Sequence, residues 1–548
     1  MGALLAVASI SVNCYSSRMT SSLATLNMSP SSPTALEARL AIARAHAGWA
    51  QAVAAGERTD AVRWVVQVAG LSASDTAASA QLLAMRLWAI EAKLRSGDPA
   101  GAEQDLHRHE RDHGATHQSR LLKAQLNYFR GDFEAAAQAC ADAIILLPPA
   151  KTPGKAYSQI VRFHAECLCL AERHDEARVL LHHAFAHKSV WTTEDIKALR
   201  RTVTDERSLA EFHAFLASYF AFPGIRSRAA LYHFSMACRD LGLYERAELA
   251  IRQRFLSASA MEAFGARPAS LGPKPQWVQD ARQTLTDLKA SMAAAEAEMF
   301  LISGTLLGAV REGDILGHDK DIDVGVMDVP GLDKRRVEEA LGSSGRFSVK
   351  PYQNPALLRV QHASGVMVDV FWHREEGGLI VHEGMKSKWW NTPFSLADFQ
   401  FLGDTHRVPE NFGRYLGENY GNWERPDTEF ETFVDTPNMV VTSEGEIVWY
   451  FYCKLFDYYL QGRVAQFGKV AAALKRLRPG DHAVQVIADQ ALSGLRHGAE
   501  ADDDNLPPIG FEALDEGLGA VEDDGGDAPL VQPMEAIRAQ QEQSEVDT

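Results

Sequence analysis

The pattern of apolar and polar residues divides this chain into a helical part and a part of mixed character. From about residue 35 to 258 the sequence is rich in Ala and Leu, helical in character, and contains few strand-like runs. Residues 259–276 are rich in Gly and Pro, which is typical of a linker. The pattern therefore predicts an all-α helical domain over 34–258 and an α/β domain with a mixed sheet over 277–480.

The mixed part begins with an amphipathic helix and continues with short strands. The helix is predicted over 278–298, with apolar residues at Leu285, Leu288 and Met292. A long helical stretch is predicted at the other end, over 447–477. Between them, strands are predicted for the segment MFLIS and for 322–327, 357–361, 366–372 and 378–381.

The helical part repeats itself. A Gly followed five residues later by an Ala recurs along it, and the interval from Ala102 to Ala136 is 34 residues. A Gly can end one helix of a pair while the small residue lets the next helix pack closely. The segment 121–148 resembles a tetratricopeptide unit, so we expect a degenerate array of five or six such units, with an irregular helical bundle as the alternative. The Gly/Ala pairs are Gly56/Ala61, Gly97/Ala102, Gly131/Ala136 and Gly242/Ala247, and Ala177 and Ala184 mark a unit without the glycine.

Charge changes this picture little, because most of the acidity lies in the tail. The formal net charge is −17, and residues 498–548 hold 15 Asp or Glu against one Arg, which accounts for −14 of it. The rest of the chain is therefore close to −3, and no basic stripe indicates nucleic acid as a partner. We expect the acidic tail over 498–548 and the Ser-rich leader over 1–33 to be disordered.

The cysteines and the amino terminus indicate the cellular compartment of the protein. Six cysteines are scattered, and the close pair Cys167 and Cys169 is too tight for the usual zinc spacings, which favours a reducing compartment. The apolar run in MGALLAVASISV is too short to span a bilayer, and no basic residue precedes it. We therefore expect a cytoplasmic protein without stable membrane insertion.

Candidate chemistry is concentrated in residues 301–323, LISGTLLGAVREGDILGHDKDID. Asp319, Asp321 and Asp323 occupy alternate positions, so in an extended strand their side chains point the same way. Such a set is costly in repulsion unless a cation lies among the carboxylates. Hard oxygen ligands favour Mg²⁺, with Mn²⁺ as a possible substitute.

A turn of small residues precedes these aspartates. Ser303, Gly304 and Thr305 lie where a strand gives way to a helix, and their hydroxyls and free backbone amides are suited to phosphate oxygens. Small residues before a helix are also common caps, so this turn alone is a weak signal. Asp369 follows Asp323 after 45 intervening residues, in the alternating run VMVDVFW. Two adjacent antiparallel strands would bring Asp369 beside the first aspartates, an arrangement similar to that of the nucleotidyltransferase fold.

Two sequence blocks resemble one known family. GTLLGAVREGDILGHDKDIDVGV is similar to the signature of the LicD and fukutin-related family, and VPENFGRYLGENYGNWERP resembles that family's closing element. The resemblance covers about residues 295–435 and implies the nucleotidyltransferase fold. Gly317, His318 and Lys320 depart from the family's pattern, which affects the identity of the substrate more than the aspartate set. The matching positions of the second block are Pro409, Tyr415, Leu416, Tyr420, Gly421, Trp423 and Pro426.

The resemblance implies a Mg²⁺-dependent phosphotransferase that takes a phospho-substituted group, such as phosphocholine or phosphoribitol, from a CDP-linked donor. The implied acceptor is a glycan or surface polysaccharide. Asp369 is also the candidate general base toward the acceptor hydroxyl. The implied metal ligands, of which the last three are catalytic, are Asp319, Asp321, Asp323 and Asp369. The implied nucleotide- or phosphate-binding residues are Ser303, Gly304, Thr305 and Arg311.

Other interpretations explain less of the sequence. An EF-hand would need Gly where Val324 stands and Glu where Pro330 stands. A lone D-x-D also occurs in glycosyltransferases and in solvated loops, and Asp369 and the second block argue against both. Two functional alternatives stay open. The repeats could be a scaffold, with a protein partner in their groove and an inactive transferase domain, or the domain could be a true nucleotidyltransferase that releases pyrophosphate.

Overall fold

The fold is known from a computed structural model of the chain, which describes residues 33–55, 58–68, 76–148, 154–186, 191–219, 225–267, 275–350 and 356–492. The predicted acidic tail and nearly all of the predicted leader lie outside these ranges. No helix within them is both long enough and apolar enough to cross a membrane.

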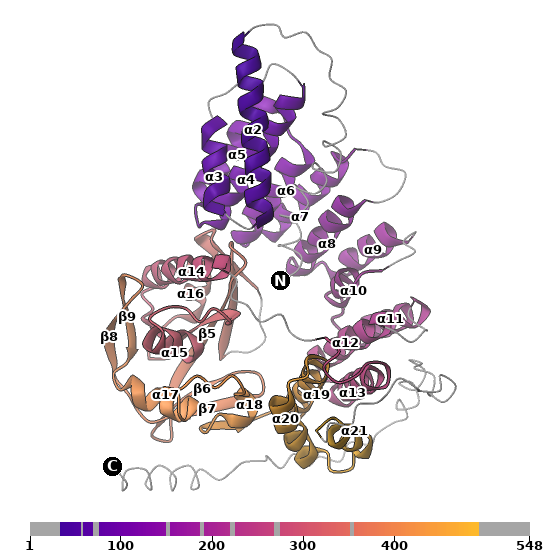
Figure 1. Cartoon of the computed structure of the whole chain (residues 1–548), viewed down its shortest axis with the longest axis vertical. Helices are drawn as coiled ribbons and strands as arrows, with labels where there is room; N and C mark the ends of the chain where they lie inside the picture. Colours follow the sequence, from indigo (N-terminus) through magenta and orange to yellow (C-terminus); the bar gives the residue numbers. More distant parts are fainter. Residues whose placement is uncertain are drawn as a thin grey trace.

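Helices form the first half of the chain and follow an arc. Figure 1 shows this helical array from the top of the view down its right-hand side, in indigo to magenta. In chain order its helices are α2 (Pro33–Ala55), α3 (Arg58–Val68), α4 (Thr76–Arg95), α5 (Pro99–His113), α6 (His117–Phe129), α7 (Phe133–Ile145), α8 (Lys155–Leu170), α9 (His174–Phe185), α10 (Thr193–Arg200), α11 (Glu206–Tyr219), α12 (Ile225–Asp240) and α13 (Tyr244–Met261).

Short turns and small residues explain how neighbouring helices of the array pack. Gly131 has a φ of 75° in the turn after α6, and the Asp132 side chain then caps α7 by accepting from the backbone N of Ala135. Ala136 of α7 is fully buried, which allows α6 and α7 a close approach. Glu172 takes a φ of 61° in the unit that lacks the glycine. The predicted all-helical region is confirmed, while its tetratricopeptide type stays a prediction.

A mixed sheet follows the array. In the described part of the chain the strand order is β10-β7-β6-β5-β2-β1-β9-β8, and β4 pairs with both β3 and β5. The β2–β5 and β1–β9 pairs are parallel, whereas the others are antiparallel, so the predicted mixed sheet is confirmed. The strands are β1 (Met299–Leu301), β2 (Asp321–Met327), β3 (Phe347–Val349), β4 (Leu357–His362), β5 (Met367–Glu376), β6 (Leu379–Glu383), β7 (Ser387–Asn391), β8 (Leu396–Phe401), β9 (Asp404–Pro409) and β10 (Met439–Val441).

The two strands that carry the aspartates are neighbours, but their predicted antiparallel orientation is wrong. β2 and β5 run parallel, with Asp323 opposite Asp369 in the register. A parallel pair needs a crossover, and the connection supplies one through α16 (Lys334–Ser343), β3 and β4. The antiparallel neighbour of this part of β5 is β4 instead.

Helices pack against the sheet and complete its core. They are α14 (Pro275–Ala294), α15 (Ser303–Arg311), α16, α17 (Phe412–Tyr420) and the short α18 (Thr432–Asp435). Leu285, Leu288 and Met292 of α14 are buried in this core, as the amphipathic pattern predicts. Val324 of β2 and Val368 of β5 belong to the same core, so the aspartate strands have a rigid base.

The end of the described chain returns to the array. It forms α19 (Glu444–Gln461), α20 (Val464–Leu477) and α21 (His482–Leu492). The helical stretch predicted over 447–477 is divided at Gly462, whose φ of 69° ends α19. Tyr452 of α19 and Phe467 of α20 share one apolar core with Phe255 of α13. The range 277–480, which the sequence predicts as one unit, therefore contributes to two cores.

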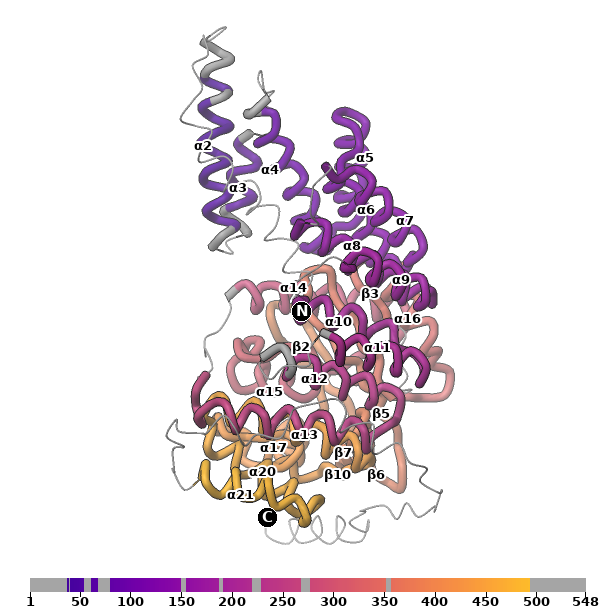
Figure 2. Tube along the Cα trace, turned by 90° about the vertical axis from the view of Figure 1, so that its right-hand side faces the viewer, coloured from indigo at the N-terminus to yellow at the C-terminus, as the bar shows by residue number. Residues whose placement is uncertain are grey.

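The array meets the sheet domain at two ends. Near β3, Lys350 Nζ lies 3.0 Å from Glu166, and Arg346 Nε donates to the backbone oxygen of Gly97 at 2.8 Å. At the other end α13 packs along α19, and Trp449 Nε1 donates to Ser235 Oγ at 3.0 Å in the adjoining α12. In Figure 2 the helices α10 to α13 lie in front of the sheet domain. The array therefore passes across one side of the sheet domain.

Candidate active site

Three carboxylates meet where the parallel strands β2 and β5 lie side by side. Asp321 and Asp323 alternate along β2, and Asp369 lies opposite Asp323 on β5. One oxygen of each of the three side chains lies within 4.8 Å of the others. Carboxylates at this spacing can share one divalent cation after small side-chain rotations, because Mg²⁺–oxygen bonds are about 2.1 Å long. The three predicted catalytic aspartates are thus brought together.

Burial and mutual repulsion make this cluster suited to a cation. Burial raises the pKa of Asp321 to about 6, with further contributions from the charges of Asp319 and Asp369. Burial, followed by the charges of Asp321 and Asp369, raises the pKa of Asp323 well above its ordinary value. A divalent cation among the oxygens reverses this penalty, because it favours the charged carboxylates. The donor set therefore fits Mg²⁺ both in ligand chemistry and in charge.

Asp319 lies in the loop before β2, beside this cluster and against the amino-terminal end of α15. A Cβ built on Gly304 would come within 2.3 Å of Asp319 Oδ2, so the glycine leaves room for the carboxylate. Burial raises the pKa of Asp319 to about 6. Its oxygens do not belong to the group that lies within 4.8 Å. The structure therefore places Asp319 next to the other aspartates rather than among them.

The turn predicted to bind phosphate divides into two roles. Ser303 and Gly304 line the cleft in front of the aspartates, at the amino-terminal end of α15. Thr305 is buried, and its Oγ1 accepts a hydrogen bond from the backbone N of Asp323 at 2.9 Å. Thr305 thus ties α15 to β2, while Ser303 and Gly304 stay open to a ligand.

Arg311 and the second sequence block lie at the other end of α15. An Arg311 guanidinium nitrogen is 3.5 Å from the backbone oxygen of Trp423, and another is 3.1 Å from Glu312. Arg311 is not among the residues that line the cleft. Tyr420, at the end of α17, does line it, and burial raises its pKa well above the ordinary value. The second block therefore supports the site through α17.

Arg359 is a site residue that the sequence argument missed. It lies opposite Asp369 in the β4–β5 register, and its guanidinium donates to both oxygens of that carboxylate, from Nε to Oδ1 and from Nη2 to Oδ2. The Nε–Oδ1 distance is 2.6 Å. The turn at Ser364 and Gly365 joins these strands, and Gly365 has a φ of 98°. Centring a hairpin on this turn would have placed Arg359 opposite Asp369.

A cleft of about 1460 Å³ opens in front of the aspartates and is lined from both parts of the chain. The sheet domain contributes acidic, basic and aromatic residues to its lining. The array contributes residues from the ends of α10 and α12. The charged residues that line this cleft are Arg200, Arg201, Arg239, Asp240, Asp319, Asp321, Asp323, Arg359, Asp369, Lys386 and Glu446, and its aromatic lining includes Trp389, Phe433, Trp449 and Tyr450.

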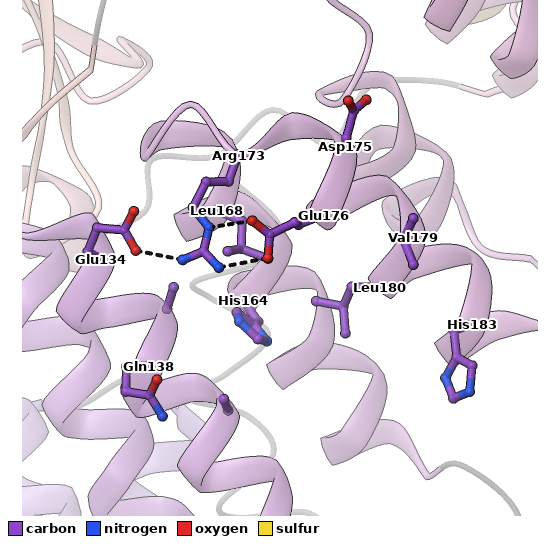
Figure 3. A pocket seen from close by; sticks show the side chains of 12 residues that line it. Glu134, Gln138, His164, Leu168, Arg173, Asp175, Glu176, Val179, Leu180 and His183 are labelled. Atoms are coloured by element: carbon purple, nitrogen blue, oxygen red, sulfur yellow. Dashed lines mark hydrogen bonds and ion pairs between the residues drawn. The ribbon is translucent and has the colours of Figure 1, made fainter.

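A second, smaller groove of about 700 Å³ lies within the array, between α7, α8 and α9. Figure 3 shows Arg173 between Glu134 and Glu176, with ion-pair distances of 2.6 and 2.7 Å. Val179 lines this groove and is 68% exposed. None of the clustered aspartates reaches the groove, and the predicted protein partner of the repeats stays a prediction.

Comparison with known proteins identifies the domain that holds the aspartates. Residues 296–411 match a family model described as LicD/FKTN/FKRP, nucleotidyltransferase domain. Ribitol-5-phosphate transferase FKTN of Mus musculus is 27% identical over 172 residues, which cover 30% of this chain and 35% of that protein. The chain thus spans about a third of the length of this curated relative. The matched range contains Asp321, Asp323 and Asp369, and the chain therefore carries a nucleotidyltransferase domain of the LicD/FKTN/FKRP family.

Proposed function

We propose that this chain is a Mg²⁺-dependent transferase that moves a phospho-substituted group from a CDP-linked donor to a hydroxyl of a glycan. The observation that carries the proposal is the cluster of Asp321, Asp323 and Asp369 within a cleft of a LicD/FKTN/FKRP domain. The relative's name supports a group of the phosphoribitol type, and phosphocholine is the other group that the sequence resemblance implies.

The proposed reaction exchanges one phosphorus–oxygen bond for another. The oxygen of the acceptor hydroxyl forms a bond to the phosphorus of the transferred group. The bond from that phosphorus to the oxygen shared with CMP breaks, and CMP leaves with the electron pair. The hydroxyl proton passes to a base. Mg²⁺ held by Asp321, Asp323 and Asp369 would supply positive charge to the phosphate oxygens.

The chain's own groups position the reactants in this proposal. Ser303 and Gly304 stand at the start of α15, where free backbone amides are suited to phosphate oxygens. Asp369 is the proposed base, and both of its oxygens accept from Arg359 in the structure. Each Asp369 oxygen keeps a second lone pair for the proton, and release of one oxygen by Arg359 would open further room for the acceptor hydroxyl. The released guanidinium still lines the cleft, where it can donate to a donor phosphate.

A non-catalytic scaffold and a pyrophosphate-releasing nucleotidyltransferase are the alternative functions. The aspartate cluster favours an enzyme, because a domain that had lost activity has no need to keep three buried, mutually repelling carboxylates. The domain matches the LicD/FKTN/FKRP family model, and a relative of part of the chain is named as a ribitol-5-phosphate transferase. Both matches favour transfer of a phospho-substituted group over release of pyrophosphate.

One assay separates the three functions. The protein is incubated with Mg²⁺ and, in turn, CDP-choline, CDP-glycerol, CDP-ribitol and nucleoside triphosphates, and released CMP and pyrophosphate are measured. We expect CMP from a CDP-linked donor, no CMP in EDTA, and a loss on the order of 100-fold or more in Asp321→Asn/Asp323→Asn. Asp398→Asn is the matched control, because Asp398 is 69% exposed on β8 and pairs only with Arg407.

The other outcomes of this assay are also informative. Release of pyrophosphate from a nucleoside triphosphate would identify a nucleotidyltransferase instead. Absence of turnover with every donor, together with unchanged nucleotide binding in the double variant, would favour the scaffold.

A further inference from the structure

The side of the cleft that the helical array provides is basic. Arg200 ends α10, Arg201 follows it, and Arg239 lies in the last turn of α12. All three line the same cleft as the aspartates, and Figure 2 shows α10 and α12 in front of the strands β2 and β5. Cationic side chains of the array and carboxylates of the sheet domain therefore face a common space.

The acidic groups of this wall do not fully balance its cations. Asp240 accepts from Arg200 and from Arg239, each at 2.6 Å, so two guanidinium groups share one carboxylate. Arg239 has a second acid, Glu446, at 3.9 Å, and burial raises the pKa of Glu446, which disfavours its charge. The Nε of Arg200 is buried without a hydrogen-bond partner. Arg200 and Arg239 therefore keep positive charge and hydrogen-bond donors that can bind an anion.

Lys386 adds an ammonium group to this basic wall. It lies in the turn between β6 and β7 and lines the cleft. Its Nζ stands 4.0 Å from the ring centre of Phe433 and 4.8 Å from that of Tyr450. Among the residues that the structure describes, this Nζ has neither an ion pair nor a hydrogen bond. Burial lowers the pKa of Lys386 to about 8, against the opposing effect of the Glu446 charge.

Lys386 connects the basic wall to the aspartates. Lys386 lines the same cleft as Arg239 of the array and Arg359 of β4. Arg359 contacts Asp369, whereas Arg239 belongs to the array. We call Arg359, Lys386, Arg239 and Arg200 the cationic path, which leads from the aspartate cluster across the cleft to the array.

We infer that the cationic path binds a phosphate group carried by the acceptor, so that the acceptor is a phosphate-bearing saccharide rather than a neutral glycan. The inference rests on the proposed transferase function. The donor's diphosphate belongs at the aspartate cluster, where a cation can bridge it. The path continues beyond that cluster to the array, and the aromatic faces of Trp389 and Tyr450 beside it suit a sugar ring.

The size of the cleft also favours two substrates. Sites for one drug-sized ligand usually enclose about 300–1000 Å³. The cleft encloses about 1460 Å³, which leaves room for an acceptor next to a nucleotide-linked donor. An acceptor phosphate held at Lys386 would keep the neighbouring hydroxyls of the sugar within the cleft that Asp369 also lines.

Binding of a simple probe tests the anion site without turnover. Isothermal titration calorimetry in EDTA compares glucose 6-phosphate, glucuronate and glucose as ligands of the full chain. We expect glucose 6-phosphate to bind at least about tenfold more tightly than glucose, and Lys386→Met or Arg239→Gln to remove most of this preference. Lys386→Arg keeps the charge and should keep the preference. Stronger binding of glucuronate than of glucose 6-phosphate would overturn the choice of phosphate.

Lys454→Met is the matched control for this experiment. Lys454 Nζ stands 5.1 Å from the ring centre of Tyr450, on the same ring that Lys386 approaches, but Lys454 does not line the cleft. We expect Lys454→Met to bind glucose 6-phosphate like the unmodified chain. Equal binding of glucose and glucose 6-phosphate, or an equal loss in Lys454→Met and Lys386→Met, would overturn the inference.

Competition separates the acceptor's phosphate from the donor's. With Mg²⁺ present, we expect CDP and glucose 6-phosphate to bind together, each changing the other's dissociation constant less than about threefold. Mutual exclusion would show that the cationic path holds the donor's phosphates and would overturn the inference. If no donor yields CMP while Lys386→Met still abolishes glucose 6-phosphate binding, the transferase function fails and the phosphate site stands. If CMP is released but Lys386→Met leaves the KM of a phosphorylated acceptor unchanged, the phosphate site alone fails.

Discussion

At the scale of single residues, the contact between Arg359 and Asp369 shows how the site holds its charge. The Asp369 side chain is 6% exposed, whereas that of Arg359 is 44% exposed. A buried carboxylate therefore obtains its cation from a side chain that reaches in from the cleft. A guanidinium in this place can leave at moderate cost, because water solvates it once it moves. Arg359 thus pairs with Asp369 without blocking it permanently.

Removing Arg359 should make the protein depend on a divalent cation for stability. We expect Arg359→Gln to lower the free energy of unfolding by about 1–2 kcal/mol in EDTA, because Asp369 loses its partner while Arg359 itself is partly solvated. Urea unfolding with and without Mg²⁺ measures the effect, which should shrink when Mg²⁺ is present. Arg374→Gln is the control, since Arg374 pairs with Glu376 and Glu383 away from the cleft. An equal loss with and without Mg²⁺ would contradict the prediction.

Lys386 should make stability depend on pH. Burial lowers its pKa to about 8, Arg239, Arg359 and Lys454 add to this effect, and Glu446 opposes it. In the unfolded chain Lys386 keeps the ordinary lysine pKa of about 10.4, so between pH 8 and 10.4 the unfolded state binds more protons than the folded state. The free-energy cost of holding the charged Lys386 in the folded state therefore falls as the pH rises over this range. Lys386→Met should therefore stabilise the ligand-free protein at pH 7, by at most about 3 kcal/mol.

The pH range in which this gain disappears checks the origin of the effect. Thermal or urea unfolding of the unmodified chain and of Lys386→Met between pH 7 and 10 should show the difference shrinking above pH 8. A difference that is constant over this range would mean that the ammonium is not the source of the cost.

At the scale of elements, the start of α15 depends on one small residue. Asp319 Oδ2 occupies the space that a Cβ on Gly304 would need, with a separation of only 2.3 Å. Ser303 beside it has a φ of 48°, so the backbone makes its turn into the helix at this point. The loop that carries Asp319 and the helix that carries Ser303 therefore fit together only without a side chain at Gly304.

Gly304→Ala should displace the loop before β2. We expect a loss of about 1–3 kcal/mol in the free energy of unfolding and a weaker stabilisation by Mg²⁺ and donor, because the added methyl overlaps the Asp319 carboxylate. Thermal unfolding with and without Mg²⁺ measures both effects. Gly413→Ala is a close control: Gly413 is also the second residue of its helix, α17, and a Cβ there meets its nearest atom at 3.8 Å. Similar losses in the two variants would refute the argument from space.

At the scale of the whole molecule, the array and the sheet domain are joined on both sides of the cleft. Glu166 of α8 binds Arg201 of the array at 2.5 Å and Lys350 of the sheet domain at 3.0 Å. Burial alone would raise the pKa of Glu166, but Arg201 and Lys350 hold it below its ordinary value. The shared core of α13, α19 and α20 makes the second connection. The width of the cleft therefore depends on contacts between distant segments.

Glu166→Gln should loosen the first of these connections. The substitution leaves two half-buried cations, Arg201 and Lys350, without a carboxylate, so we expect a loss of about 2–4 kcal/mol in the free energy of unfolding. Urea unfolding measures this loss, and limited proteolysis should show earlier cleavage between the two parts. Glu176→Gln is the control, because Glu176 is 62% exposed and pairs with Arg173 on the array surface. A loss no larger than that of the control would argue against Glu166 as a connection between the parts.

Part of the site follows from local sequence, and part does not. The side-chain alternation of a strand places Asp321 and Asp323 on one face wherever the strand lies, and the small-residue turn before α15 follows from Ser303 and Gly304. Arg359 is the exposed residue of the otherwise buried strand β4, and only its register with Asp369 reveals its role. Register depends on the turn and on the packing of both faces, which single-residue patterns do not contain.

The sequence by itself determined the helical array, the aspartate strand and the family of the domain, because these depend on periodicity and on short blocks of neighbouring residues. Only the tertiary structure decided the parallel pairing of β2 with β5 and the return of α19 to α21 to the array. It also decided the meeting of Arg239, Lys386 and Arg359 in one cleft. These features join segments that are separated in the sequence, by 46 residues for Asp323 and Asp369 and by 147 for Arg239 and Lys386. Their contacts are selected by packing of the complete chain rather than by any local pattern.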